Sequence, residues 1–337
     1  MNLSLDNILN LVEYTLLYAA IFSLVALGGM FSERSGVINI ALEGIMVIGA
    51  ITGAVVLVWL QRTPNPETMS DGVVNFLQYV QNKGKFLMVI LSILASAIGG
   101  GIYSLLLAFA SINLKADQTI GGTALNMLAT AVALVIARLT NITLNDKTSP
   151  KINYNNTMFK FGSLTFEVNW FFVVAVIALI ISFIVLYKTK FGLRMRSCGE
   201  HPQASASLGI NVYKMRYAGV IISGILGGIG GLAFVIPSVS DWNFEVGVIG
   251  AGFLSLSVMI FGQWKPVRIF GAALFFGLFR SLANTSDSMF PILVKAGITT
   301  HIFNMIPYIL SIVVLAFTSK NSRAPKAEGI PYEKGMR

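Results

Sequence analysis

Residue types that commonly carry catalysis or metal binding are scarce in this sequence. Its 337 residues include one cysteine, Cys198, and two histidines, His201 and His301. A single cysteine excludes an intrachain disulfide framework and a cysteine cluster around a metal. The phosphate-binding motif GxxxxGK[ST] is absent as well, so the chain is not expected to cradle nucleotide phosphates itself. The function classes that remain are a transporter, a channel and a membrane scaffold.

Charged residues are also few. They make up 12% of the chain while hydrophobic residues make up 55%, whereas soluble domains are about a quarter charged. Mean hydropathy is +0.74. Long apolar runs recur along the whole chain, which excludes one signal peptide ahead of a soluble body. The sequence predicts an all-α fold, a polytopic bundle of transmembrane helices in one domain, 1–318, followed by a cytoplasmic tail at 319–337.

The apolar runs set the number of membrane crossings. A helix needs roughly 20 apolar residues to cross the hydrocarbon core. On that scale we predict nine spans, with eight or ten as alternatives. The predicted spans are 10–30, 37–60, 86–112, 121–140, 169–188, 217–236, 248–262, 268–285 and 302–318.

The distribution of lysine and arginine predicts the orientation, because positive charges in short loops stay cytoplasmic. The segment 187–217 carries six of them and the tail after residue 318 carries five. Four predicted spans separate these segments, so both lie on one side. In all, the predicted inner segments hold 15 lysines and arginines and the outer loops hold 7. The N-terminus is therefore predicted outside and the C-terminus inside, and the net charge of +9 does not indicate a nucleic-acid partner.

A carboxylate lies inside the second predicted span, in GVINIALEGIMVIGA (36–50). Polar groups inside a membrane are costly, and they face a bundle interior or a watery path. Asn39 lies four residues before Glu43, one helical turn away on the same face, and Asn126 is a second polar group in an apolar span. Two interpretations of Glu43 stay open: it braces backbone groups at a helix break, or it lines a translocation path. For Asn126 the alternatives are an interhelical hydrogen bond or the path.

The second half of the chain has a similar feature. In SDWNFEVGVIGAGFLSL (240–256), Asp241, Asn243 and Glu245 precede a glycine-broken apolar run. Interrupted segments in matching positions of two halves are typical of a transporter's central site. The glycines of GILGGIGG (224–231) predict close helix packing. The candidates for the path or a helix break are therefore Asn39, Glu43, Asn126 and Asn243.

The basic segment between the fifth and sixth predicted spans, 189–216, is longer than a simple connection requires. Glycines and a proline surround the small-residue patch QASASLG. This pattern favours a short helix outside the membrane that contacts a partner; a basic anchor at lipid headgroups is the alternative. The candidate partner-contact residues are Arg194, Arg196, Gly199, Glu200, Ala204, Ser205, Ala206 and Gly209.

Several of these stretches resemble a known family over nearly the whole chain from about residue 10. LGGMFSERSGVINIALEGIMVIGA resembles the SERSGVxNIxLEGxMxIGA signature of ABC-importer permeases of the branched-chain amino acid and ribose type. LKADQTIGGTALNMLA is similar to the second permease subunit of the nucleoside-importer branch. FGLRMRSCGEHPQASASLGINVYKMRY is similar to the loop with which these permeases contact their ATPase. GAGFLSLSVMIFGQWKPVRIFGAALFFG and the tail SKNSRAPKAEGIPYEKG extend the resemblance.

The resemblance implies a subunit of a heteromeric importer in a bacterial cell membrane. A second, unlike permease would complete the pore, and a cytoplasmic ABC ATPase would bind the coupling loop at 189–216. An extracellular lipoprotein would deliver a nucleoside, for example guanosine. ATP and Mg would bind to the ATPase, so this chain would need no cofactor and would not be an enzyme. A sugar or a branched-chain amino acid is the alternative substrate.

Two other functions stay open at this point. A proton-coupled secondary transporter could use Glu43 as its proton carrier and would need neither ATP nor a partner. A scaffold of a membrane complex would move no solute even with its partners. The first of these gives no reason for the long basic segment 189–216.

Overall fold

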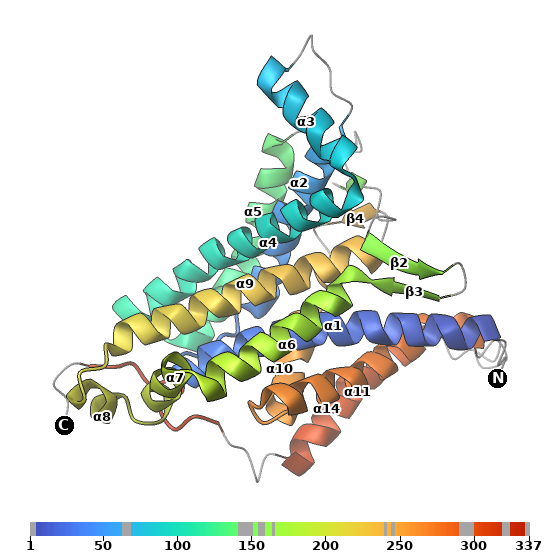
Figure 1. The fold of residues 1–337 in the computed structure, drawn as a ribbon. Coiled ribbons are helices and arrows are strands. Elements are labelled where there is room, and N and C mark those ends of the chain that lie inside the picture. Colours follow the sequence, from blue (N-terminus) through green and yellow to red (C-terminus); the bar gives the residue numbers. More distant parts are fainter. Residues whose placement is uncertain are drawn as a thin grey trace.

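The computed structural model describes residues 5–62, 69–140, 151–153, 159–163, 166–238, 241–243, 247–289, 300–318 and 324–333. Long helices form a bundle, with short strands at one end (Figure 1). The long helices are α1 (Leu5–Ser35), α2 (Leu42–Gln61), α4 (Lys85–Ala108), α5 (Gln118–Leu139), α6 (Trp170–Lys188), α9 (Val212–Ser238), α11 (Pro266–Asn284) and α14 (Thr300–Thr318). The shorter elements are α3 (Asp71–Lys83), the π-helical η1 (Phe109–Asn113), α7 (Lys190–Glu200), α8 (Pro202–Ser207), α10 (Ala251–Phe261) and α12 (Ser286–Met289).

The core is built around α1. Every residue from Leu17 to Glu33 is buried, because α6, α9, α10 and α11 all contact this helix. A helix that is apolar on all sides is typical of the core of a large protein or of a membrane span. The exposed apolar side chains lie instead on helices such as α4, α5 and α6, as with Ile98, Met127 and Ile181.

Glycines allow the closest helix contacts. A Cβ added at Gly49 of α2 would lie 2.2 Å from Cα of Gly228 in α9, and one at Gly100 of α4 would lie 2.3 Å from the carbonyl oxygen of Gly224. Only a residue without a side chain permits such backbone approach. The close packing predicted for 224–231 is therefore confirmed.

The predicted count of nine spans is not confirmed. Within the described residues seven helices are long and apolar enough to cross a membrane: α1, α2, α4 continued through η1, α5, α6, α9 and α11. The predicted span 248–262 is the eleven-residue helix α10, which is about 16 Å long against a hydrocarbon core of about 30 Å. The predicted span 302–318 is helical as α14, although α14 is not among the seven.

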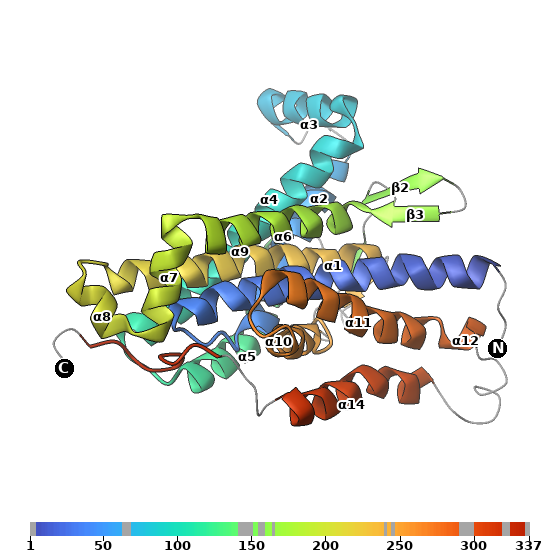
Figure 2. The ribbon, with the colours of Figure 1, turned by 60° about the horizontal axis from the view of Figure 1, so that its bottom comes forward.

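The two ends of the bundle differ. Strands β2 (Lys160–Ser163) and β3 (Phe166–Asn169) pair antiparallel, and β1 (Lys151–Asn153) pairs antiparallel with β4 (Asp241–Asn243). These strands and the start of α1 lie at one end, while α7 and α8 lie at the other (Figures 1 and 2). The predicted outer loop 61–85 contains the helix α3. A search for apolar runs does not find this helix, because one of its faces is polar.

Candidate functional site

The chain is broken between α1 and α2. Gly36 has φ +97°, a conformation that favours glycine, and the residues up to Ala41 are not helical. The Oε1 atom of Gln118, at the start of α5, accepts a hydrogen bond of 2.7 Å from the backbone N–H of Ile38. Asn39 therefore does not lie one helical turn before Glu43 as predicted, because the helix carrying Glu43 begins only at Leu42.

Asn126 of α5 bridges this break on both sides. Its Nδ2 group donates to the carbonyl oxygen of Ile40 at 2.9 Å, and its Oδ1 accepts from the backbone N–H of Gly44 at 2.7 Å. The first N–H groups of a helix have no partner within the helix, so Asn126 supplies one acceptor that α2 needs. Asn39 is fully buried, and its Nδ2 donates to Ser223 Oγ of α9 at 2.8 Å.

Glu43 reaches from α2 to a second break, just before α10. Its Oε1 accepts from the backbone N–H of Gly250 at 2.8 Å and its Oε2 from that of Gly252 at 2.7 Å. Gly250 has φ +73°. Any side chain at Gly252 would collide with the Glu43 backbone and carboxylate. A carboxylate at a helix N-terminus is favourable because the free N–H groups carry partial positive charge.

The remaining candidate for the helix breaks or the path is Asn243. Asn243 lies in β4, where its backbone is paired with Lys151 of β1; its side chain lies outside the described part of the structure. A residue not foreseen from the sequence completes the second break: the Tyr308 hydroxyl of α14 donates to the carbonyl oxygen of Ile249 at 2.9 Å. A tyrosine in an apolar helix is a weak signal by itself.

The basic segment folds as two short helices. The Thr189 hydroxyl accepts from the backbone N–H of Gly192 at 3.2 Å and so caps α7. Ser205 of α8 and Ser197 of α7 share a hydrogen bond of 2.7 Å that holds the two helices together. Gly209 has φ +78° with open space around it, so its backbone conformation rather than crowding favours glycine there.

The predicted partner-contact residues divide into exposed and inward-facing groups. Arg194, Ala204 and Gly209 are exposed, whereas Gly199 and Ser205 are buried. Three others make partly internal contacts. The Arg196 guanidinium lies over the Tyr187 ring at 4.9 Å, Glu200 pairs with Arg34 of α1 at 3.7 Å, and Ala206 packs against a small apolar cluster. Leu208, which follows α8 and is 82% exposed, is a further candidate for partner contact that the sequence pattern did not indicate.

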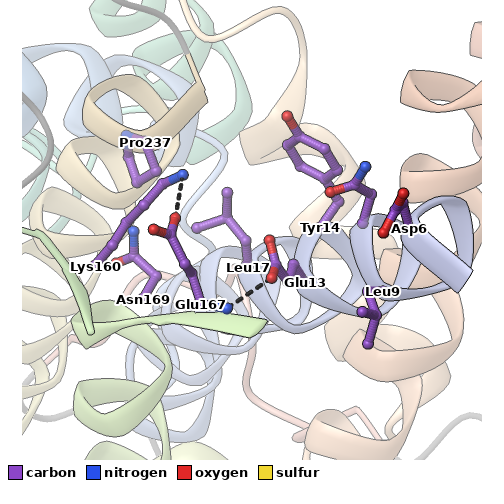
Figure 3. Close-up of a pocket in the computed structure, with 10 residues that line it drawn as sticks. Asp6, Leu9, Glu13, Tyr14, Leu17, Lys160, Glu167, Asn169 and Pro237 are labelled. Atoms are coloured by element: carbon purple, nitrogen blue, oxygen red, sulfur yellow. Dashed lines mark hydrogen bonds and ion pairs between the residues drawn. The ribbon is translucent and has the colours of Figure 1, made fainter. Parts of the chain in front are cut away.

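A polar cavity of about 410 Å³ lies at the opposite end of the bundle, between α1 and the β2–β3 hairpin (Figure 3). Lys160 of β2 pairs with Glu167 of β3 at 2.9 Å, and the backbone N–H of Glu167 donates to Glu13 of α1 at 2.6 Å. The first contact joins the two strands of the hairpin, and the second holds the hairpin against α1. The lining residues are Asp6, Leu9, Asn10, Glu13, Tyr14, Leu17, Lys160, Glu167, Asn169 and Pro237.

The fold and these sites define a polytopic helical membrane protein in which buried polar side chains hold two broken segments. The chain belongs to the family described as the permease component of the branched-chain amino acid transport system, whose sequence pattern matches residues 11–315. It is 40% identical over 334 residues to the guanosine ABC transporter permease protein NupQ of Bacillus subtilis, covering 97% of each chain.

Two further relatives come from Lactococcus lactis subsp. cremoris. The nucleoside ABC transporter permease protein NupC is 37% identical over 333 residues, covering 96% of each chain. The nucleoside ABC transporter permease protein NupB is 28% identical over 161 residues, covering 47% of this chain and 44% of NupB. No solved structure matches the chain. The family resemblance read from the sequence is confirmed.

Proposed function

We propose that this chain is a membrane-spanning permease subunit of an ABC importer for nucleosides, with guanosine as a purine example. The observation that carries the proposal is the similarity, over nearly the full length, to one permease named for guanosine and another named for nucleosides. The chain itself would make and break no covalent bonds. A sugar or a branched-chain amino acid is the alternative substrate.

The same similarity to ABC transporter permeases supports a set of partners. A second, unlike permease would pack beside this chain, and the two Lactococcus permeases NupB and NupC, both similar to it, support such a pair. A cytoplasmic ATPase would bind ATP and Mg, since this sequence has no phosphate-binding motif of its own. An extracellular lipoprotein would deliver the nucleoside.

We assign Glu43 and Asn126 to bracing the two helix breaks rather than to carrying protons or solute. All four hydrogen bonds that support this assignment join a side chain to a backbone group at a helix start or turn. A buried backbone N–H without an acceptor costs about 1–3 kcal/mol, so each of these side chains stabilises the break that it contacts.

We assign α7 and α8 to contact with the ATPase. Both helices lie at the end of the bundle that also holds the described part of the C-terminal tail (Figure 2). Arg194, Ala204 and the adjoining Leu208 are exposed. We expect a groove of the ATPase to bury Leu208, which is 82% exposed directly after the small-residue helix α8.

The decisive experiment measures uptake of radiolabelled guanosine into proteoliposomes that contain both permeases, the ATPase and the lipoprotein. We expect uptake that needs internal ATP and persists when a protonophore removes the proton gradient. Omission of the ATPase is the matched control and should abolish uptake. Uptake by this chain alone, driven by a proton gradient, would instead establish the secondary transporter. Preferential uptake of a sugar or an amino acid over guanosine would overturn the assignment of a nucleoside as the substrate.

A further inference from the structure

The C-terminal segment 324–333 folds back onto the bundle instead of extending away from it (Figure 2). Its residues Pro325, Ala327 and Tyr332 are buried. The backbone N–H of Ala327 donates to the carbonyl oxygen of Gly199 in α7 at 2.9 Å. Ordering a chain terminus costs conformational entropy, so a tail held by a hydrogen bond and buried side chains is part of the fold.

The same turn of the tail also touches the break between α1 and α2. A Cβ added at Gly36 would lie 3.4 Å from the carbonyl oxygen of Ala327, and one at Gly329 would lie 2.8 Å from the Ile38 side chain. Gly329 has φ +76°, a conformation that favours glycine. Two overlapping turns, 325–328 and 327–330, therefore contact both α7 and the broken segment.

Charged groups surround the place where the tail contacts α7 and the broken segment. The Glu328 side chain hydrogen-bonds with the Glu33 side chain of α1, and Glu33 in turn accepts a hydrogen bond from the indole N–H of Trp264. The neighbouring Arg34 pairs with Glu200, at the end of α7, and donates to the carbonyl oxygen of Trp264. The end of α1, the end of α7 and the loop before α11 thus meet beneath the tail.

The last described residues of the tail reach two more elements. The Tyr332 ring contacts the Tyr213 ring of α9 edge-on, with centroids 5.3 Å apart. Glu333 forms an ion pair with Lys115, which lies between η1 and α5. The segment therefore crosses from α7 over the helix break to the starts of α9 and α5.

We propose that segment 324–333 is a positioning element that joins α7 to the broken segment between α1 and α2, so that movement of α7 and α8 reaches that segment. This inference rests on the proposed function, in which α7 and α8 receive force from the ATPase. The connection continues inward, because the broken segment leads into Glu43 and Glu43 holds the start of α10. A tail that served only as a solvated end would need none of these contacts.

The first test uses Ala327→Pro in the reconstituted assembly. Proline has no N–H and cannot donate to Gly199, while the exposed surface of α8 is unchanged. We expect the ATPase to co-purify and hydrolyse ATP at its basal rate. Stimulation of hydrolysis by the loaded lipoprotein, and uptake with it, should fall about tenfold, since one hydrogen bond is lost. Lys326→Pro is the matched control and should keep both, because it puts proline at the second position of the turn 325–328, where proline is favoured.

A second pair of variants separates this role from simple destabilisation. Gly329→Asn and Gly329→Val place the same Cβ beside Ile38, but asparagine tolerates a positive φ and valine does not. We expect the asparagine variant to stay coupled and the valine variant to lose stimulated hydrolysis, while both still bind the ATPase and keep its basal hydrolysis. Equal coupling in both variants, loss of ATPase binding in Ala327→Pro, or its uptake at the unmodified rate would overturn the proposal. Failure of the unmodified assembly to transport would count against the proposed function instead.

Discussion

The carboxylate of Glu43 accepts a hydrogen bond of 2.8 Å from the backbone N–H of Gly250, which lies 207 residues further along the chain. The contact joins the start of α2 to the start of α10. Both helices begin after a left-handed glycine and an irregular stretch of chain, so each break leaves backbone groups that need partners within the membrane protein. One side chain therefore ties together the two interrupted parts of the bundle.

The first prediction separates bracing from proton transport at Glu43. Glu43→Gln keeps the shape and one acceptor oxygen, so we expect a modest fall in guanosine uptake with no new dependence on pH. Glu43→Leu leaves two N–H groups without an acceptor, at about 1–3 kcal/mol each, and should reduce both uptake and the yield of folded protein. Size-exclusion chromatography of the detergent-solubilised variants measures that yield.

A proton carrier would behave differently in the same experiment. Glu43→Gln cannot bind and release a proton at this position, so accumulation would disappear although the protein is folded. That result would establish the secondary transporter and remove the bracing role.

Part of this arrangement could be predicted from the sequence. Glu43 and Asn126 are recognisable because a polar side chain in an apolar run must have a compensating partner. Their partners could not be predicted, since Gly250 and Ile40 lie far from them in the chain and offer only backbone groups. The start of α2 at Leu42, rather than at residue 37 as predicted, is also hidden, because hydropathy is the same for a helix and for an irregular apolar segment.

Contacts between distant parts of the chain also explain why the predicted spans and the structure of the tail differ from what the sequence pattern indicates. An apolar run around 248–262 predicts a crossing, but the glycines at its start delay the helix until Ala251. Nothing in the polar, proline-containing tail indicates that Ala327 and Tyr332 are buried. Their burial depends on a surface that α7, α9 and the α1–α2 break form together.

The second prediction concerns orientation, which depends on the distribution of lysine and arginine. A protease tag placed after Arg337 should be protected in right-side-out vesicles, because the tail belongs to the positively charged side. A tag within 141–168 should be cleaved from outside. Opening the vesicles with detergent provides the control, since both tags should then be cleaved. Cleavage of the tag after Arg337 by external protease would reverse the predicted orientation of the whole chain.

The third prediction concerns the dependence of tail docking on pH. Burial raises the pKa of Glu328 from its ordinary value of 4.5 to about 7, against smaller lowering effects of Glu33 and Arg34. A detached tail loses this proton near pH 4.5, whereas the docked tail keeps it until about pH 7. Docking should therefore be strongest at low pH and weaken as the pH rises towards 7. After correction for the intrinsic rise of amide exchange with pH, hydrogen exchange at the Ala327 amide should be faster at pH 8 than at pH 6.

The matched variant for this measurement is Glu328→Gln, which keeps the shape and stays neutral. Its exchange rate, corrected for the intrinsic effect of pH, should be the same at both values. A pH dependence that survives in Glu328→Gln would assign the effect to another group.

The fourth prediction tests α7 and α8 as the ATPase contact, and the structure decides which residue to change. A tryptophan at Ala206 would disturb the chain itself, because Ala206 packs against Cys198, Val212 and Tyr332. Leu208 is a better position, since its side chain is 82% exposed and its removal costs the isolated chain little.

Leu208→Asp should therefore fold normally and lose the ATPase. A carboxylate in an apolar groove is desolvated without a partner, so we expect the fraction of ATPase that co-purifies to fall about tenfold or more. Uptake should fall with it, while the affinity of the lipoprotein for guanosine should not change, because that site is on another polypeptide. Asn211→Asp is the control: it adds the same charge nearby and keeps the helix cap, in which the side chain accepts from the Lys214 N–H at 3.0 Å. If Leu208→Asp binds the ATPase and imports guanosine at the unmodified rate, α7 and α8 are a basic anchor at the lipid headgroups rather than the coupling contact.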